Sequence, residues 1–193
     1  MRRLTAFAAL VLAAACAGPT GAVEVPPERL PFSLDRTPPA PLPSPGERLV
    51  TIYLVRNGRL AAVTRLVSGE LPAVETSMRA LLLGPSPTER VEGIGTAVPS
   101  ATQLIGVEVA ERVAEVDLSA EFQIPAEPQD VFLRVAQVVW TLVADPAVVS
   151  VRFSVDGVSI SVPIDDGTIP ARPVSAADLA SVGPIEAAIV TNP

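Results

Sequence analysis

The distribution of proline is the feature that most limits what this chain can fold into. Nine of its 21 prolines lie between Ala17 and Glu47. Proline has no backbone N–H to donate and biases the preceding residue towards extended conformations, so neither a helix nor a central strand is expected there. The segment is predicted to be a semi-rigid extended spacer. The functional alternative is a docking motif for a proline-reading partner.

The residues after this spacer are the only part of the chain dense in periodic apolar positions. They comprise residues 48–167, about 120 in number, which is enough to bury a core of their own. Beyond Gly167, prolines at 170, 173, 184 and 193 interrupt the chain repeatedly. Residues 168–193 are therefore predicted to form a loosely ordered C-terminal tail, with at most a short helix over 175–182.

The N-terminus is typical of a secretory signal peptide. Two arginines precede an apolar run over residues 4–12, shorter than the roughly 20 residues that span a bilayer. The run leads to Cys16 in a pattern that resembles a bacterial lipobox, although Ala13 stands where leucine is usual. We predict a lipoprotein signal peptide over 1–15, lipidation of Cys16 and a proline-rich tether over 16–47. An acylated cysteine would anchor the protein at the outer face of the cell membrane. The alternative is an ordinary signal with an incidental cysteine.

The residue types that are missing exclude several kinds of chemistry. All 14 basic residues are Arg, there is no His, and the only Cys is the one at position 16. The chain therefore lacks the usual Schiff-base nucleophile, the commonest general base and the third member of a Ser-His-Asp triad. A net charge of −7 disfavours nucleic acid as a partner. We expect no enzymatic activity, no cofactor and no metal. The exclusive use of Arg also suggests the GC-rich genome of an actinobacterium.

Hydrophobic periodicity within residues 48–167 predicts both strands and helices. Asn57-Gly58 and Asp156-Gly157 each lie between β-type segments and predict tight hairpins. The expected strands cover 51–55, 60–67, 94–98, 104–109, 113–118, 149–155 and 158–162, and the expected helices cover 72–83 and 128–143. The second helix contains five Val and could instead be a strand by propensity. It carries Trp140, which is expected to be a core residue rather than a ligand platform. The pattern predicts an α+β domain with one largely antiparallel β-sheet and two helices packed on it.

Asp117, Ser119 and Glu121 form the tightest polar cluster of the chain. Residues two apart on a strand share a face, so the three side chains could be neighbours. Two carboxylates could act as a hydrolytic acid and base; alternatively, the cluster bonds nearby backbone amides. The run Asp165-Asp166-Gly167 could supply oxygens to Ca²⁺, but an acidic turn is the preferred interpretation.

In their order and spacing, several segments resemble the GerMN domain of bacterial sporulation and germination proteins. They are VTIYLVRNGRLAAVTR, MRALLLGPSPTER, GIGTAVPSATQLIGVEV, EVDLSAEF and VAQVVWTLVADPAVVSVRFSVDG, which together span about Leu49 to Gly167. The resemblance implies a single GerMN-like domain. It also implies an extracytoplasmic location, because the family occurs in lipoproteins and in membrane-tethered sporulation proteins. No catalytic residue is implied.

Two functions of different class follow from the sequence. The first is a non-catalytic, membrane-anchored lipoprotein whose domain binds an envelope or membrane protein. The second is a small-molecule or cell-wall-fragment binder, with weak hydrolase activity as one form of it. An exposed apolar or edge-strand patch would favour the first; a deep pocket with convergent carboxylates and an aromatic wall would favour the second.

Overall fold

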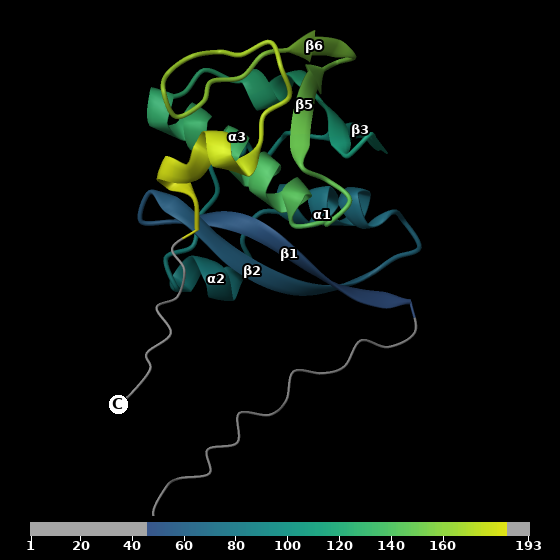
Figure 1. The fold of residues 1–193 in the computed structure, drawn as a ribbon. Coiled ribbons are helices and arrows are strands. Elements are labelled where there is room, and N and C mark those ends of the chain that lie inside the picture. The colour runs from purple at the N-terminus through teal and green to yellow at the C-terminus, as the bar shows by residue number, and fades with distance from the viewer. Residues whose placement is uncertain (1–45, 185–193) are drawn as a thin grey trace, which may run out of the picture. The chain divides into compact units, whose positions relative to one another are not determined.

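The strands form two separate sheets (Figure 1). The computed structural model describes residues 46–184. The first sheet is an antiparallel hairpin of β1 (Glu47–Arg56) and β2 (Arg59–Ser68). The residues of its turn, Asn57 and Gly58, have φ of 52° and 73°. Two successive positive φ values define a type I′ turn, as the Asn-Gly pair predicts.

The second sheet has four strands in the order β3-β4-β5-β6. They are β3 (Leu104–Ala110), β4 (Val113–Leu118), β5 (Ser150–Val155) and β6 (Val158–Ile160). The β3–β4 and β5–β6 pairs are antiparallel, whereas β4 and β5 are parallel. The α+β class is confirmed, but the single sheet expected from the sequence is divided in two. The parallel pair arises because a helix connects β4 to β5 and returns the chain in the same direction.

Two longer helices contact both sheets (Figure 1). They are α1 (Ala73–Leu82) and α3 (Pro128–Val143), and both were predicted. The short α2 (Pro87–Val91) was not. The strand expected over 94–98 is absent, and an isolated bridge between Val55 and Gly95 takes its place. The strand does not form because the amide of Ala97 donates to the Gln137 side chain at 2.7 Å instead of to a neighbouring strand.

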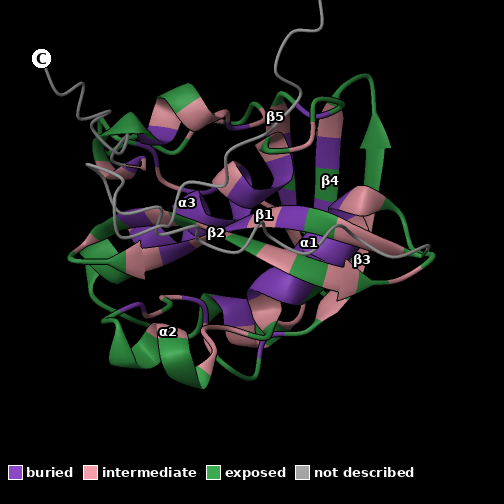
Figure 2. Ribbon diagram, turned by 90° about the horizontal axis from the view of Figure 1, so that it is seen from below, coloured by how far each residue is buried: buried purple, intermediate pink, exposed green. Residues whose placement is uncertain are grey.

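The core lies around α3, whose middle turns are buried on every side (Figure 2). Leu142, Val138 and Val139 have no exposed surface. Trp140 is partly buried and packs against the Tyr53 ring at a centroid distance of 5.6 Å. None of the helices formed by residues 46–184 has the length and apolar character needed to cross a lipid bilayer.

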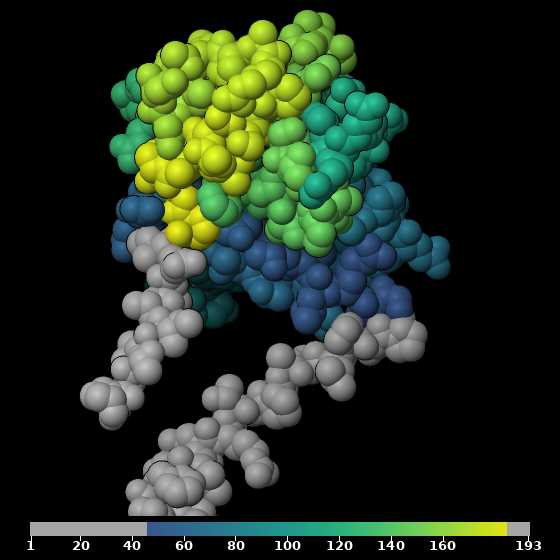
Figure 3. Space-filling model, in the orientation of Figure 1, coloured from purple at the N-terminus to yellow at the C-terminus, as the bar shows by residue number. Residues whose placement is uncertain are grey.

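The segment after Gly167 packs on the domain as far as the structure describes it, so the loosely ordered tail predicted over 168–193 is wrong for residues up to 184. Val174 exchanges two backbone hydrogen bonds of 2.8 Å with Val151. The 3₁₀ helix η3 (Ala176–Val182) contacts α3 and buries Leu179 completely. In Figure 3 this segment, in yellow, covers part of the surface. Burial of Val174 and Leu179 holds this segment on the domain although its prolines prevent regular helix and strand. The remaining tail, the signal peptide, Cys16 and most of the tether lie outside the described residues.

Candidate functional site

The predicted polar cluster divides into two separate groups. Asp117, on β4, accepts a hydrogen bond from the Gly157 amide in the β5–β6 turn at 3.1 Å. Ser119 lies beyond the end of β4 and accepts from the Gln103 amide at 2.9 Å. Glu121 lies in the 3₁₀ helix η2 (Ala120–Gln123), and a hydrogen bond from the Ser119 hydroxyl lowers its pKa.

This arrangement has direct consequences for the chemistry that the cluster could perform. Asp117 accepts a hydrogen bond from the β5–β6 turn. Ser119 instead bonds to Glu121 and to Gln103 in the segment before β3. The two carboxylates are thus held by different neighbours. A hydrolytic pair needs both aimed at one substrate, so the backbone-bonding interpretation of the cluster fits these contacts better.

The acidic turn at 165–167 bonds to the protein itself. Asp165 accepts from the amide and hydroxyl of Ser181 at 2.7 and 2.6 Å. Asp166 accepts from the amide and hydroxyl of Thr168 at 2.8 and 2.6 Å. Within residues 46–184, no group of three or more His, Cys, Asp or Glu side chains is placed to hold a metal ion.

A groove lies between α1 and β3 on the surface of the residues that the structure describes. It consists of two hollows of about 460 and 500 Å³, and Arg79 and Leu104 line both. We call it the α1–β3 groove. Its α1 side carries Glu75, Arg79, Leu82 and Leu83. β3 is an edge strand of its sheet, so the groove lies beside a strand that has a partner on one side only.

The α1–β3 groove combines exposed apolar side chains with a buried polar group that lacks a partner. Leu83 is 82% exposed and Ile105 is 55% exposed. Thr102, which also lines the groove, is only 6% exposed, and its hydroxyl has no hydrogen-bond partner in the described structure. A buried hydroxyl without a partner costs free energy.

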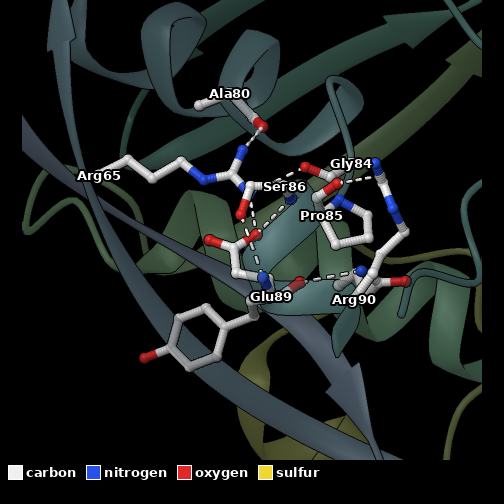
Figure 4. A network of polar contacts seen from close by, with 9 residues as sticks. Arg65, Ala80, Gly84, Pro85, Ser86, Glu89 and Arg90 are labelled. Carbon is white, nitrogen blue, oxygen red and sulfur yellow. Dashed lines mark hydrogen bonds and ion pairs between the residues drawn. The ribbon is translucent and has the colours of Figure 1, made fainter. Parts of the chain in front are cut away.

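The end of α1 is fixed by a network centred on Arg65 of β2 (Figure 4). The Arg65 guanidinium donates to the carbonyls of Ala80 and Gly84 at 3.1 and 2.8 Å and to Glu89 at 2.6 Å. Glu89 in turn accepts from the Ser86 amide at 2.7 Å and donates its own amide to the Ser86 hydroxyl, a capping box that starts α2. Burial opposes ionisation of Glu89, but the bonds from Ser86 and Arg65 lower its pKa overall. The network thereby holds the turn that follows Leu83.

A stripe of buried polar residues on α3 was not predicted from the sequence. Arg134, Gln137 and Thr141 are 4%, 0% and 1% exposed. Their spacings of three and four residues place them along one side of the helix. A signal was available: polar residues in a helix expected to lie deep in the core must find partners there.

Each residue of the stripe bonds to another part of the chain. Gln137 donates to the Tyr53 carbonyl at 3.0 Å and accepts from the Ala97 amide. Thr141 accepts from the Tyr53 amide at 3.0 Å. Gln137 and Thr141 therefore pair the backbone of β1 along the edge that faces away from β2, where a neighbouring strand would otherwise be needed.

Residues 46–184 form a small α+β domain in which two helices contact both β-sheets. It is similar to the first GerMN domain of the sporulation protein GerM from Bacillus subtilis, with 22% identity, a TM-score of 0.51 and coverage of 68% of this chain and 99% of that one. It is also similar to the tandem GerMN domains of the same protein, with 20% identity and a TM-score of 0.51, covering 68% of this chain but 45% of that one. A comparison with curated proteins finds none that matches.

The chain belongs to the Germane family, described as "Sporulation and spore germination", which matches residues 50–161. This match covers more than half of the chain and confirms the GerMN resemblance found in the sequence. The segment 168–184, which packs on the domain, lies beyond it.

Proposed function

We propose that this protein is a non-catalytic, extracytoplasmic lipoprotein whose GerMN domain binds another protein of the cell envelope through the α1–β3 groove. The proposal rests chiefly on the exposed apolar side chains of Leu83 and Ile105, which line this groove beside an edge strand. The membrane location rests on the lipobox-like sequence around Cys16.

The charges along the α1–β3 groove indicate which kind of partner would fit. Glu108 and Glu115 face each other directly across β3 and β4, an arrangement of like charges that destabilises a sheet. Glu115 has one distant cation, Arg152 at 3.7 Å. A partner segment with a basic side chain would relieve this repulsion. An apolar side chain beside it would cover Leu83.

The groove is tested by crosslinking in intact cells, followed by identification of the captured neighbours. Leu83→Asp places a charge on the exposed rim of the groove, so we expect it to remove a reproducible envelope-protein neighbour without loss of folding. Val91→Asp is the matched control, because Val91 is 89% exposed and lies on α2 outside the groove. Equal capture by both variants would refute the groove as the interface.

Anchoring is tested separately with Cys16→Ser. We expect the variant to leave the membrane fraction while keeping the thermal unfolding transition of the domain, because the substitution changes none of the residues 46–184 that form the domain. Fractionation and immunoblotting measure the release. A variant that stays with the membrane after signal cleavage would exclude the lipid anchor.

The second candidate is binding of a small molecule or cell-wall fragment. The observation that favours it is a separate cavity lined by the buried Arg134. Weak hydrolase activity is the less supported form of this candidate, because Asp117 and Glu121 are held by different neighbours.

A further inference from the structure

Arg134 is a buried cation whose bonds within the described chain are all to backbone carbonyls. It is 4% exposed. Its Nε donates to the Ala97 carbonyl at 3.1 Å, and its Nη1 donates to the carbonyls of Phe122 and Ile124. The guanidinium also lies 5.9 Å from the centre of the Phe122 ring. These bonds join α3 to the loop before it and to residue 97.

The charge of Arg134 is not neutralised by any carboxylate in contact with it. No ion pair joins Arg134 to an acidic residue among residues 46–184, and Asp130 acts on it only at longer range. Desolvation lowers the pKa of Arg134, but an arginine stays protonated in proteins. Burying an unpaired charge is expensive. In addition, Nη2 makes no hydrogen bond within this part of the chain, although a guanidinium has five N–H donors.

Arg134 lines a cavity whose other walls are mainly apolar. The cavity measures about 240 Å³ and is formed partly by Ile124, Pro125, Val131, Val135, Val162 and Pro163. Ile124 is 47% exposed, so the cavity opens to solvent beside the loop before α3. Its volume is below the 300–1,000 Å³ of drug-sized sites, which restricts it to a small ligand. It shares no residue with the α1–β3 groove.

We propose that this cavity binds a small monocarboxylate with an apolar body, whose carboxylate bonds to the Arg134 guanidinium. The apolar walls accept the body of the ligand, and the carboxylate supplies the counter-charge that the protein does not. Charge-assisted bonds of a guanidinium to a carboxylate are among the stronger hydrogen bonds in proteins. The site is independent of the groove proposed for the partner protein, so either can fail alone.

Hexanoate is the probe for this site, and equilibrium dialysis of the labelled acid against the full-length chain measures its binding. We expect saturable binding at one site. Because a hydrogen bond to a charged group contributes more than a neutral one, 1-hexanol should need at least about tenfold higher concentration to displace the label than unlabelled hexanoate does. Absence of saturable binding, or equal displacement by the alcohol, would overturn the proposal.

Substitution of Arg134 itself would strip several carbonyls of their partners and could unfold the domain, so the site is tested by filling the cavity. Val131→Phe adds bulk to a partly buried wall residue that makes none of the bonds to Arg134. We expect this variant to lose hexanoate binding. Val91→Phe, the same change at an exposed position on α2, should bind as the wild type does. Retention of binding by Val131→Phe would place the ligand elsewhere and reject this site.

Discussion

Gln137 connects three segments of the domain from one completely buried side chain. It donates to the Tyr53 carbonyl and accepts from the Ala97 amide and, at 3.3 Å, from the Thr96 hydroxyl. Gln137 itself is completely buried, so the backbone groups that face it would lack a partner without this side chain. A group left in that state costs about 1–3 kcal/mol.

At the residue scale we expect Gln137→Leu to destabilise the protein by about 2–4 kcal/mol, because the Tyr53 carbonyl and the Ala97 amide both lose their partner. Urea denaturation of the two proteins measures the difference. Gln129→Leu is the matched control: it makes the same change at an exposed position of α3 and should shift stability by less than about 0.5 kcal/mol. Similar losses in both variants would contradict this role of Gln137.

Turns whose conformation is set by adjacent residues were predictable from the sequence, whereas contacts between distant segments of the chain were not. The turns at Asn57-Gly58 and Asp156-Gly157 were recognised because an Asn-Gly or Asp-Gly pair specifies its own backbone conformation. The partners of Arg134 and Gln137 come from segments that only the tertiary fold brings to α3. Likewise, the predicted neighbours Asp117 and Glu121 are separated because β4 ends at Leu118 and a 3₁₀ helix follows.

At the element scale, the Arg65 network decides where α1 stops and α2 starts. Gly84, with φ of 69°, ends α1 in a conformation that residues with a side chain adopt at a cost. The side chains of Arg65 and Glu89 are only 18% and 17% exposed, so their bond is less weakened by water than a surface ion pair. The helix pair therefore depends on the ionised form of Glu89.

A carboxyl whose pKa is lower in the folded state stabilises the fold fully above its unfolded pKa, about 4.3 for Glu, and that contribution is lost as the pH falls through the folded-state pKa. We therefore expect Glu89→Gln to lower the free energy of unfolding at pH 7 by about 1–2 kcal/mol. Between pH 7 and pH 3, the free energy of unfolding should fall less for this variant than for the wild type. Denaturation curves at both pH values measure this.

Glu92→Gln is the control for this pH dependence. Glu92 forms a 3.7 Å pair with Arg56 in which both side chains are about half exposed, so the variant should keep the wild-type dependence. An unchanged acid response in Glu89→Gln would show that the network does not depend on this charge.

At the scale of the whole molecule, the folded domain continues beyond β6, its last strand, up to residue 184. Arg59, next to the β1–β2 turn, donates to the carbonyl of Gly183 at 3.2 Å. Asp178 receives bonds from Arg172 and Ser175, and these lower its pKa strongly. The prolines suggested a loose tail, but proline excludes only regular helix and strand; it does not prevent apolar residues such as Leu179 from packing.

We expect a chain that ends at Gly167 to be less stable than one that ends at Pro184 by at least about 3 kcal/mol, because it loses the burial of Val174 and Leu179. Thermal unfolding of the two chains tests this. Leu179→Ala in the longer chain should account for about 2–4 kcal/mol of the difference. Equal stability of the two truncated chains would mean that residues 168–184 contribute nothing to the domain.

The buried polar stripe of α3 also affects how such a domain can change during evolution. Apart from the Thr96 hydroxyl, its hydrogen bonds end on main-chain atoms, which every amino acid carries except for the N–H that proline lacks. Positions such as 53 and 97 can therefore drift without breaking these bonds, while 134, 137 and 141 cannot. Pairs in contact would then show little covariation, and sequences could diverge widely while the helix keeps the same neighbours.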